Sequence, residues 1–219
     1  MFLCASSAIL ATLLTAPALA AQQSVRIVDG DTIELSGIVY RLHGIDAPEA
    51  GQTCMTAAGA QWPCGKSAIS ALEDLALGKT VKCDSRGQDD YGRRIGVCTV
   101  DNVDLNAAMV SNGYAWAFRK YSTDYSKAED DARVRKVGVW QAQTQTPWEY
   151  RAAKWEVAKQ DAPKGCPIKG NTSKNGNIYH APWSPWYSKT KVSLGQGERW
   201  FCSEADAVKA GWKAPYWGR

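Results

Sequence analysis

The sequence of 219 residues lacks three features, and each absence argues against a class of protein. Lys and Arg (26) exceed Asp and Glu (22) by only four, which excludes a histone-like polycation and an acidic solvating chain. No C-x-x-C spacing occurs among the seven cysteines, so the pattern gives no support to a structural zinc site. The apolar run at residues 1–19 is too short and too weak for a convincing membrane span, so we expect no stable membrane association.

Charge and tryptophan are unevenly distributed along the chain. Residues 1–140 contain 14 Lys and Arg against 16 Asp and Glu, whereas residues 141–219 contain 12 against 6. Seven of the ten tryptophans also lie in the second stretch. Hydrophobic residues (45%) and charged residues (22%) are in the range of a globular protein, and the length allows one domain or two small ones. The uneven composition predicts two units with different roles.

The N-terminus has the pattern of an export signal. The first 28 residues carry one charge, at Arg26, and their apolar run ends in the sequence Ala-Leu-Ala at residues 18–20. An A-x-A sequence after an apolar run is typical of a leader-peptidase cleavage site. Because no Lys or Arg precedes the run, either the true start lies upstream or the signal is atypical, and a membrane anchor is the alternative. We expect residues 1–20 to be a signal peptide that exports the protein to the periplasm or the extracellular medium.

Removal of this leader leaves six cysteines, and an even number in an exported protein indicates disulfide bonds. The sequence alone does not settle their connectivity. Local order favours three pairs: Cys54 with Cys64, Cys83 with Cys98, and Cys166 with Cys202. The middle pair is the best supported, because residues 81–83 and 95–98 have the pattern of two strands flanking a polar turn. Strands paired across that turn would bring the two sulfurs within bridging distance.

Hydrophobic periodicity predicts a mainly β fold with helices. Strands are expected at residues 24–28, 32–35, 38–43, 80–84, 94–100 and 114–118, and helices at residues 66–77, 104–110 and 122–137. Short strands with a helix between the third and the fourth favour a small Greek-key barrel of the OB type. Strands and helices do not alternate regularly, which argues against a doubly wound sheet.

These patterns divide the chain into successive segments. Residues 21–142 form the first domain. Residues 143–165 are predicted to be a helix that begins near Pro147, followed by a linker. Residues 166–219 form a small, basic and aromatic module with one helical stretch at residues 203–210. A unit of this size gains stability from a disulfide or a metal.

Three polar clusters in the first domain have residue types suited to chemistry on phosphate esters. The first is the turn at residues 29–32, with two carboxylates two residues apart. The second, residues 41–49, places an arginine on a strand and then two carboxylates in a loop stiffened by proline. The third is the turn at residues 91–94, which presents aromatic and cationic groups. A turn or a capped loop explains each cluster taken alone, so the argument depends on their order and spacing.

These residue types predict phosphodiester hydrolysis. Calcium prefers carboxylate and carbonyl oxygens, and a carboxylate that does not bind the metal can orient or deprotonate the attacking water. Two guanidinium groups can hold phosphate oxygens and stabilise the additional charge of the transition state. Aromatic side chains nearby can stack on a base.

From about Val25 to Trp140, over half of the chain, the sequence resembles the thermonuclease (staphylococcal-nuclease-like) family, with all three clusters in the family order. The resemblance implies a five-stranded OB barrel with three helices and calcium-dependent cleavage of DNA and RNA. By this resemblance, Asp31 and Asp46 are the carboxylate ligands of calcium, and Ala47 contributes a backbone carbonyl. Glu49 acts on the attacking water. Phosphate is bound by Arg41 and Arg93, and the nucleotide is contacted by Tyr91 and Tyr121. Asp29 is a weaker metal candidate.

The sequence also departs from this family. Asp90 stands where the best-known members have lysine, and Arg119 where they have an aromatic residue; both differences are expected to change nucleotide preference. The excursion closed by Cys54 and Cys64 is additional and is expected to shape the mouth of the site. His43 shares the strand face of Arg41, but the family needs no histidine, so a structural role is expected.

The C-terminal module resembles one that is appended to many bacterial thermonuclease-like proteins, with a Tyr179-His180 stretch and a helix start at residues 200–207. Three interpretations stay open. The module is a small aromatic core held by a Cys166–Cys202 disulfide, or a nucleic-acid capture surface of cations and aromatic rings. The third is a zinc site of Cys166, His180 and Cys202, for which no fourth ligand is evident.

The sequence therefore predicts an exported calcium-dependent endonuclease, a monomer whose only inferable partner is its nucleic-acid substrate, DNA or RNA. The alternative is a non-catalytic OB-fold module that binds nucleic acid. A third reading, a cell-envelope adhesion protein with a decayed nuclease domain, depends only on the signal and the module. The presence of all five polar residues that the family uses favours the enzyme: Asp31, Arg41, Asp46, Glu49 and Arg93.

Overall fold

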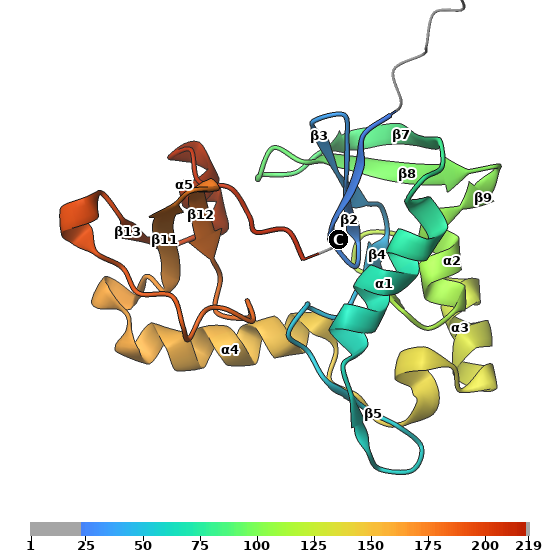
Figure 1. Cartoon of the computed structure of the whole chain (residues 1–219). Helices are drawn as coiled ribbons and strands as arrows, with labels where there is room; N and C mark the ends of the chain where they lie inside the picture. Colours follow the sequence, from blue (N-terminus) through green and yellow to red (C-terminus); the bar gives the residue numbers. More distant parts are fainter. Residues whose placement is uncertain (1–22, 218–219) are drawn as a thin grey trace, which may run out of the picture.

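A computed structural model describes residues 23–217. The expected signal peptide, residues 1–20, lies outside the described residues. The chain forms a first unit (residues 23–142) and a C-terminal unit (residues 166–217), which are connected by the long helix α4 (Pro147–Asp161) (Figure 1).

A mixed sheet is the framework of the first unit. Its strand order is β1-β2-β3-β8-β7, with the short β9 (Val103–Asp104) paired to β8. The pairs are antiparallel except for β3 with β8, which is parallel. The strands span Val25–Asp29 (β1), Thr32–Leu35 (β2), Ile38–Leu42 (β3), Val81–Gln88 (β7) and Arg94–Val100 (β8). Among the described residues, the amide of Gln23 connects the start of β1 to β7, because it both donates to and accepts from the backbone of Val81 (2.8 and 2.9 Å).

Three helices pack with this sheet: α1 (Cys64–Ala76), α2 (Leu105–Ser111) and α3 (Ser126–Arg135). Strand and helix residues that point inward form one apolar core, which includes Ile27, Ile33, Leu42, Leu72, Leu105 and Met109. Burial of each such side chain stabilises the fold by about 1.5–3 kcal/mol. The arrangement confirms the predicted β+α fold of the OB type.

Several elements differ in length from the sequence-based expectation. The helix expected at residues 122–137 covers only Ser126–Arg135, because Ser122 and Asp124 form a turn and Lys136 adopts a left-handed conformation (φ 53°) that ends the helix. The strand expected at residues 80–84 continues to Gln88 after a register shift between Ser85 and Gly87. These limits depend on turn geometry that hydrophobic periodicity does not encode.

Two short ladders surround the loop that carries the candidate site residues. Strand β4 (Ile45–Asp46) pairs with β10 (Trp116–Ala117), so that Trp116 lies opposite Asp46. Strand β5 (Cys54–Met55) pairs with β6 (Gln61–Trp62) and forms the cysteine-closed excursion. The ladders attach the loop after β3 to segments that are distant in the sequence.

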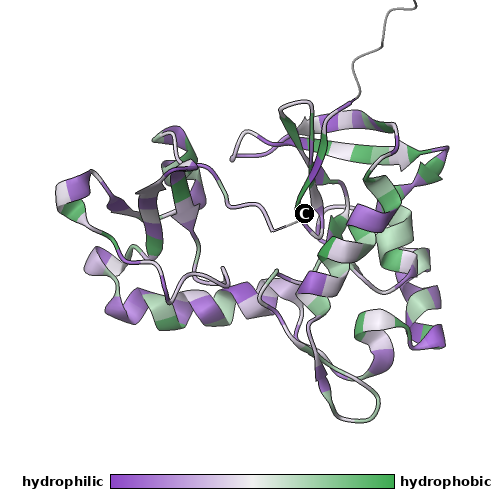
Figure 2. Ribbon diagram, in the orientation of Figure 1, coloured by the Kyte–Doolittle hydropathy of each residue, from purple (hydrophilic) through white to green (hydrophobic). Residues whose placement is uncertain are grey.

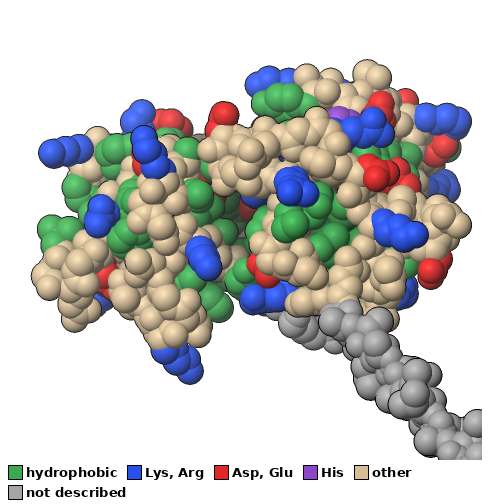
Figure 3. All heavy atoms as spheres, turned by 90° about the horizontal axis from the view of Figure 1, so that it is seen from above, with side chains coloured by type: hydrophobic (Ala, Val, Ile, Leu, Met, Phe, Trp, Pro, Cys, Tyr) green, Lys and Arg blue, Asp and Glu red, His purple; other side chains and the backbone are tan. Residues whose placement is uncertain are grey.

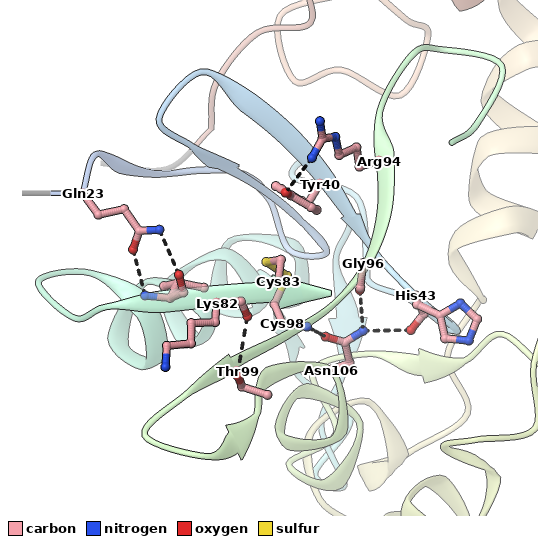
Figure 4. Close-up of a disulfide and its surroundings, with 11 residues drawn as sticks. Gln23, Tyr40, His43, Lys82, Cys83, Arg94, Gly96, Cys98, Thr99 and Asn106 are labelled. Atoms are coloured by element: carbon pink, nitrogen blue, oxygen red, sulfur yellow. Dashed lines mark hydrogen bonds between the residues drawn. A yellow bond between two sulfur atoms is a disulfide. The ribbon is translucent and has the colours of Figure 1, made fainter. Parts of the chain in front are cut away.

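Residues 23–217 contain three disulfides, and they are the pairs that local order favours. Cys54 pairs with Cys64, Cys83 with Cys98 and Cys166 with Cys202. Figure 4 shows Cys83 and Cys98 on the neighbouring strands β7 and β8, where they are direct register partners. The side chain of Asn106 lies close by and bonds to the backbone of His43, Gly96 and Cys98.

The C-terminal unit is built on a three-stranded antiparallel sheet of order β12-β11-β13. Its strands are β11 (Ile168–Ser173), β12 (Gly176–His180) and β13 (Arg199–Phe201), and α5 (Glu204–Lys209) packs on them. Its core consists of Ile168, Tyr179, Phe201, Ala207 and Trp212. Short 3-10 helices lie at Gly138–Gln141, Pro163–Gly165 and Leu194–Gln196.

Both ends of the C-terminal unit are tied to the first unit. Helix α4 begins with a capping box of Thr146 and Glu149, and it mixes hydrophilic and hydrophobic residues along its length (Figure 2). The segment after α5 returns to the first unit, as Figure 1 shows, where the Trp217 N–H donates to the Val28 carbonyl (3.1 Å). The Tyr216 hydroxyl donates to Glu34 on β2. No helix in residues 23–217 is both long and apolar enough to cross a membrane.

Candidate active site: a carboxylate and arginine cluster

The turn between β1 and β2 brings two aspartates close to the loop that follows β3. A Cβ atom at Gly30 would lie 2.9 Å from the Cβ atoms of Ala47 and Ala68, so only glycine permits this approach of the turn to the loop and α1. The Asp29 carboxylate accepts the Gly30 N–H (2.8 Å). The turn that the sequence analysis singled out is therefore packed against a second of its three clusters.

Asp31 connects this turn to the neighbouring loop and strand. Its side chain accepts the Ala47 N–H (2.9 Å) and the Thr32 hydroxyl (3.0 Å). Arg41 on β3 lies opposite Thr32 in the ladder, and its guanidinium forms an ion pair with Asp31. The strand register thus sets the distance between this carboxylate and this arginine.

Asp46 is fully buried on β4, where the ladder with β10 fixes its backbone. Arg41 donates to its Oδ1 atom (2.9 Å), so one guanidinium bridges Asp31 and Asp46. The two carboxylates that the resemblance assigns to calcium are therefore neighbours in space. Ala47, the expected carbonyl ligand, follows directly and is also buried.

Glu49 lies in a loop that is held by backbone contacts. Its N–H donates to the side chain of the buried Gln52 (3.2 Å), and its carbonyl accepts the Gln52 N–H (2.7 Å). The same carbonyl packs against Gly65 in the first turn of α1, where a Cβ atom would overlap it. Because Cys64 precedes Gly65 and is bonded to Cys54, the additional disulfide ties this loop to the start of α1.

Arg151, on α4, completes the cluster, although sequence analysis did not select it. Its Nη2 and Nη1 atoms donate to both oxygens of Asp46 (2.8 and 3.1 Å). Nη1 also donates to Glu49 (2.7 Å), and the Arg151 side chain is only 25% exposed. The term carboxylate cluster is used below for Asp29, Asp31, Asp46 and Glu49 together with Arg41 and Arg151.

The charges in this cluster are unbalanced. Burial and the charge of Asp31 raise the pKa of Asp29 to about 7. Burial and the charge of Asp29 raise the pKa of Glu49 well above its usual range. Burial also opposes ionisation of Asp46, but the charge of Arg41 and the hydrogen bonds from Arg151 lower its pKa overall. Four carboxylates face two guanidinium groups, so the fully ionised cluster has an excess of negative charge.

This donor set fits a hard divalent cation. Asp31 and Asp46 offer carboxylate oxygens, Ala47 adds a backbone carbonyl, and a dication would offset the excess negative charge. Among residues 23–217, no group of three His, Cys, Asp or Glu side chains is arranged to hold a metal ion. A cation here would consequently complete its shell with carbonyl and water oxygens, as calcium commonly does.

The hairpin between β7 and β8 carries the other predicted phosphate ligand, Arg93, and it lies outside the hydrogen-bonded cluster. Asp89 accepts both the backbone N–H and the Nε of Arg93 (2.9 and 2.7 Å). The Arg93 guanidinium lies 5.0 Å from the centre of the Tyr91 ring, and Tyr91 is 36% exposed. Asp89 thus orders a turn that presents an arginine and an aromatic ring together.

The remaining predicted residues lie elsewhere on the first unit. Tyr121 is 68% exposed and packs edge-on against Phe118 (4.8 Å between ring centres). Arg119 pairs with Glu129 (2.7 Å). This ion pair lies beside a hollow of about 460 Å³ that Phe118 and Trp148 also line. The ring of His43 contacts Asp124 (3.2 Å), which is not a member of the carboxylate cluster.

A shallow groove of about 260 Å³ lies next to the cluster, between the two units. It is lined by Tyr91, Arg151, Ala152, Trp155, Trp183 and Glu204. The rings of Trp155 and Trp183 lie 6.3 Å apart at an angle of 34°. The C-terminal unit exposes hydrophobic side chains with Lys and Arg among them on the face shown in Figure 3. The groove therefore joins aromatic rings of α4 and the C-terminal unit to the carboxylate cluster through Arg151.

Comparison with known proteins gives the class of the first unit. A family model described as "Staphylococcal nuclease homologue" matches residues 39–142, and a second model, ArfC, matches residues 146–214. The chain is 35% identical over 147 residues to a micrococcal nuclease of Shigella flexneri, with 59% of this chain and 79% of that protein covered. An uncharacterized endonuclease of Escherichia coli O157:H7 is 35% identical over 138 residues, which cover 59% and 84% of the two chains.

The chain therefore belongs to the staphylococcal nuclease family. It is also 37% identical over 123 residues to the succinoglycan biosynthesis protein ExoI of Rhizobium meliloti (strain 1021), and that alignment covers 53% of this chain and 63% of ExoI, less than two thirds. The ArfC match begins at residue 146 and includes α4, so Arg151 lies outside the segment that the nuclease family model matches.

Proposed function

We propose that this protein is an exported, calcium-dependent nuclease that hydrolyses phosphodiester bonds of DNA and RNA. The observation that carries the proposal is the convergence of Asp31, Arg41, Asp46 and Glu49 in one hydrogen-bonded cluster. Membership of the staphylococcal nuclease family supports it. Three disulfides are compatible with an exported protein, since such bonds persist in oxidising compartments.

Each residue has a role in this proposal. Arg41 and Arg93 bind the phosphate, because guanidinium groups match phosphate oxygens and stabilise the charge of the transition state. Glu49 orients the attacking water, and its raised pKa brings it closer to the neutral range in which a general base is most effective. A calcium ion held by Asp31, Asp46 and the Ala47 carbonyl would neutralise phosphate charge. Phosphate contacts carry no base information, which is consistent with activity on both DNA and RNA.

The groove supplies a surface for the bases of the substrate. The rings that line it are Tyr91 of the first unit, Trp155 of α4 and Trp183 of the C-terminal unit. Aromatic rings stack on bases of any sequence, and they hold unpaired strands better than duplex because the base faces are free. We assign nucleotide contact to this groove as well as to Tyr91, and we assign Tyr121 to a more distant part of the substrate.

The experiment is plasmid digestion by the full chain with calcium, with EDTA, and by the variant Glu49→Gln. We expect cleavage only by the unmodified protein in calcium, with a loss of about 10²- to 10⁴-fold for Glu49→Gln, the range for a general base. Glu156→Gln, at an exposed position on α4, is the matched control and should cleave normally. Equal digestion under all three conditions contradicts the proposal.

One observation favours a second function, a nucleic-acid-binding module without catalysis. Guanidinium groups already occupy both oxygens of Asp46 and one oxygen of Glu49. A site permanently capped in this way would bind nucleic acid but leave it intact. Retention of DNA in a gel shift in calcium, without any cleavage, would establish this second function.

A further inference from the structure

Arg151 brings a positive charge from outside the nuclease match into the centre of the proposed metal site. The match to the staphylococcal nuclease family model ends at residue 142, and α4 belongs to the segment that matches the ArfC model. Its guanidinium nevertheless makes three hydrogen bonds to two carboxylates of the first unit. These contacts connect residues 102 and 105 positions apart in the sequence.

Arg151 occupies much of the acceptor capacity that a metal would need. A carboxylate offers about four acceptor positions on its two oxygens. Asp46 uses three of them, two for Arg151 and one for Arg41. Asp31 likewise receives Thr32, Arg41 and the Ala47 N–H. Loss of the Arg151 contacts would free two positions on Asp46, whereas Arg41 would still bridge the two aspartates.

The charge of Arg151 also opposes metal binding, as its hydrogen bonds do. A cation bound to Asp46 would lie within a few ångströms of a guanidinium that is largely withdrawn from solvent, and like charges repel strongly at that distance. Glu49, the proposed water-orienting group, is tied to the same guanidinium (2.7 Å). The arginine therefore opposes the metal and holds the water-orienting carboxylate at the same time.

We propose that Arg151 is an internal counter-cation that competes with the metal ion for Asp46, so that the C-terminal part of the chain controls metal binding in the nuclease unit. This inference rests on the proposed function, since it concerns the metal of that site. Arg151 acts through Asp46 and Glu49 and is therefore a positioning residue.

The surroundings of Arg151 fix where its guanidinium can lie. Its neighbour Tyr150 donates its hydroxyl to the Gly51 carbonyl (3.3 Å), and Gln52 donates to the Gln145 carbonyl (2.7 Å) just before α4. A Cβ atom at Gly51 would lie 3.3 Å from the Trp183 carbonyl, so the C-terminal unit also touches this loop. The helix is docked on the loop that carries Glu49, and Arg151 also lines the groove.

The test measures calcium affinity directly, by isothermal titration of the full chain without nucleic acid. Arg151→Gln is compared with Arg151→Lys and with Lys154→Gln, which removes a charge from the exposed side of α4. We expect Arg151→Gln to bind calcium about 5- to 150-fold more tightly, the usual range of coupling between two ligands of one site. Arg151→Lys should lie between this variant and the unmodified protein, and Lys154→Gln should match the unmodified protein.

Hydrogen exchange provides a second measurement. Competition is reciprocal, so calcium must weaken the attachment of α4 to the loop as much as Arg151 weakens calcium. We expect calcium to increase amide exchange in residues 147–161 of the unmodified protein and to leave exchange unchanged in Arg151→Gln. A structural role alone would not produce this difference, since it predicts faster exchange in the variant whether or not calcium is present.

The outcomes separate the inference from the proposed function. If Arg151→Gln binds calcium no more tightly than the unmodified protein, while that protein still cleaves DNA in calcium, the inference fails and the proposed function stands. If Arg151→Gln does not fold, Arg151→Lys must still bind calcium more tightly, or the inference fails. An unmodified protein that neither binds calcium nor cleaves DNA defeats both.

Discussion

Gly65 and Glu49 meet at a backbone contact that leaves no space for a side chain. The first turn of α1 runs against the Glu49 carbonyl, and a Cβ atom at residue 65 would overlap that oxygen. A larger residue must push the loop away from the helix, because neither backbone can yield independently of the Cys54–Cys64 disulfide. The position of the proposed water-orienting carboxylate thus depends on Gly65, a residue that has no side chain.

Gly65→Ala is therefore expected to lower both stability and activity. The overlap should cost about 1–3 kcal/mol, the usual penalty for overpacking, and should reduce kcat because Glu49 is displaced. Thermal unfolding and initial cleavage rates measure the two effects. Gly195→Ala is the control, because nothing lies within 4 Å of a Cβ atom there. An alanine at residue 65 with unchanged kcat would show that the loop does not need this contact.

Individual residues of the cluster also show what the sequence predicts and what it misses. Asp31, Arg41, Asp46 and Glu49 could be selected because their order and spacing follow a family pattern, and the structure brings them together. Arg151 could not be selected, since a cation on a helix that has no distinct apolar face looks like a solvated residue. Only the docking of α4 on the loop after β4, a tertiary contact, places its charge among the carboxylates.

At the scale of elements, the alternating strands of the first unit were predictable and those of the C-terminal unit were not. Strands β2 and β3 are rich in β-branched and other apolar residues, and they lie within one residue of their expected limits. Strands β11 and β12 have sequences rich in Gly, Asn, Lys and Ser, and few of their residues are apolar. Their pairing is stabilised instead by the surrounding aromatic core and by the Cys166–Cys202 disulfide.

The sheet of the C-terminal unit should be sensitive to acid through His180. This residue ends β12 opposite Lys169 in the ladder, and its Nδ1 contacts the Ser184 hydroxyl (3.3 Å). Burial and then the charge of Lys169 lower the pKa of His180 below its ordinary value of 6.5. The folded state binds fewer protons at His180 than the unfolded chain does. The contribution of neutral His180 to the stability of the fold is therefore complete above pH 6.5 and decreases as the pH falls below that value.

Thermal unfolding of the full chain, followed by tryptophan fluorescence, measures this effect. Between about pH 7.5 and about pH 5, the unmodified protein should lose more stability than His180→Gln, which has no proton to gain. Parallel decreases in the two proteins would show that other groups cause the acid sensitivity.

At the scale of the whole molecule, the two units share one groove. Tyr91 comes from the first unit, Arg151 and Trp155 from α4, and Trp183 from the C-terminal unit. Figure 1 shows the β7–β8 hairpin directed toward the C-terminal unit, and the segment between α5 and Trp217 crosses back to β1. The net charge of +4 is an average over a slightly acidic first unit, which concentrates carboxylates, and a basic remainder.

Removal of a ring from this groove should weaken substrate binding more than it slows chemistry. Trp183→Ala is expected to raise KM for a single-stranded oligonucleotide with little change in kcat, by a loss of about 1–3 kcal/mol for one stacked base. Trp186→Ala is the control, because that exposed ring packs on Trp217 and does not line the groove. On an oligonucleotide with abasic residues, Trp183→Ala and the unmodified protein should have the same KM. A difference in KM that persists on this substrate would exclude base stacking.

The central claim is that the carboxylate cluster hydrolyses phosphodiesters with the help of calcium. The most direct measurement is the initial cleavage rate of one single-stranded oligonucleotide by the full chain, first with excess chelator and then as free calcium is restored. The account predicts no cleavage in chelator and a saturable, fully reversible rise with calcium. Cleavage at the same rate in chelator, or none at saturating calcium, would contradict it.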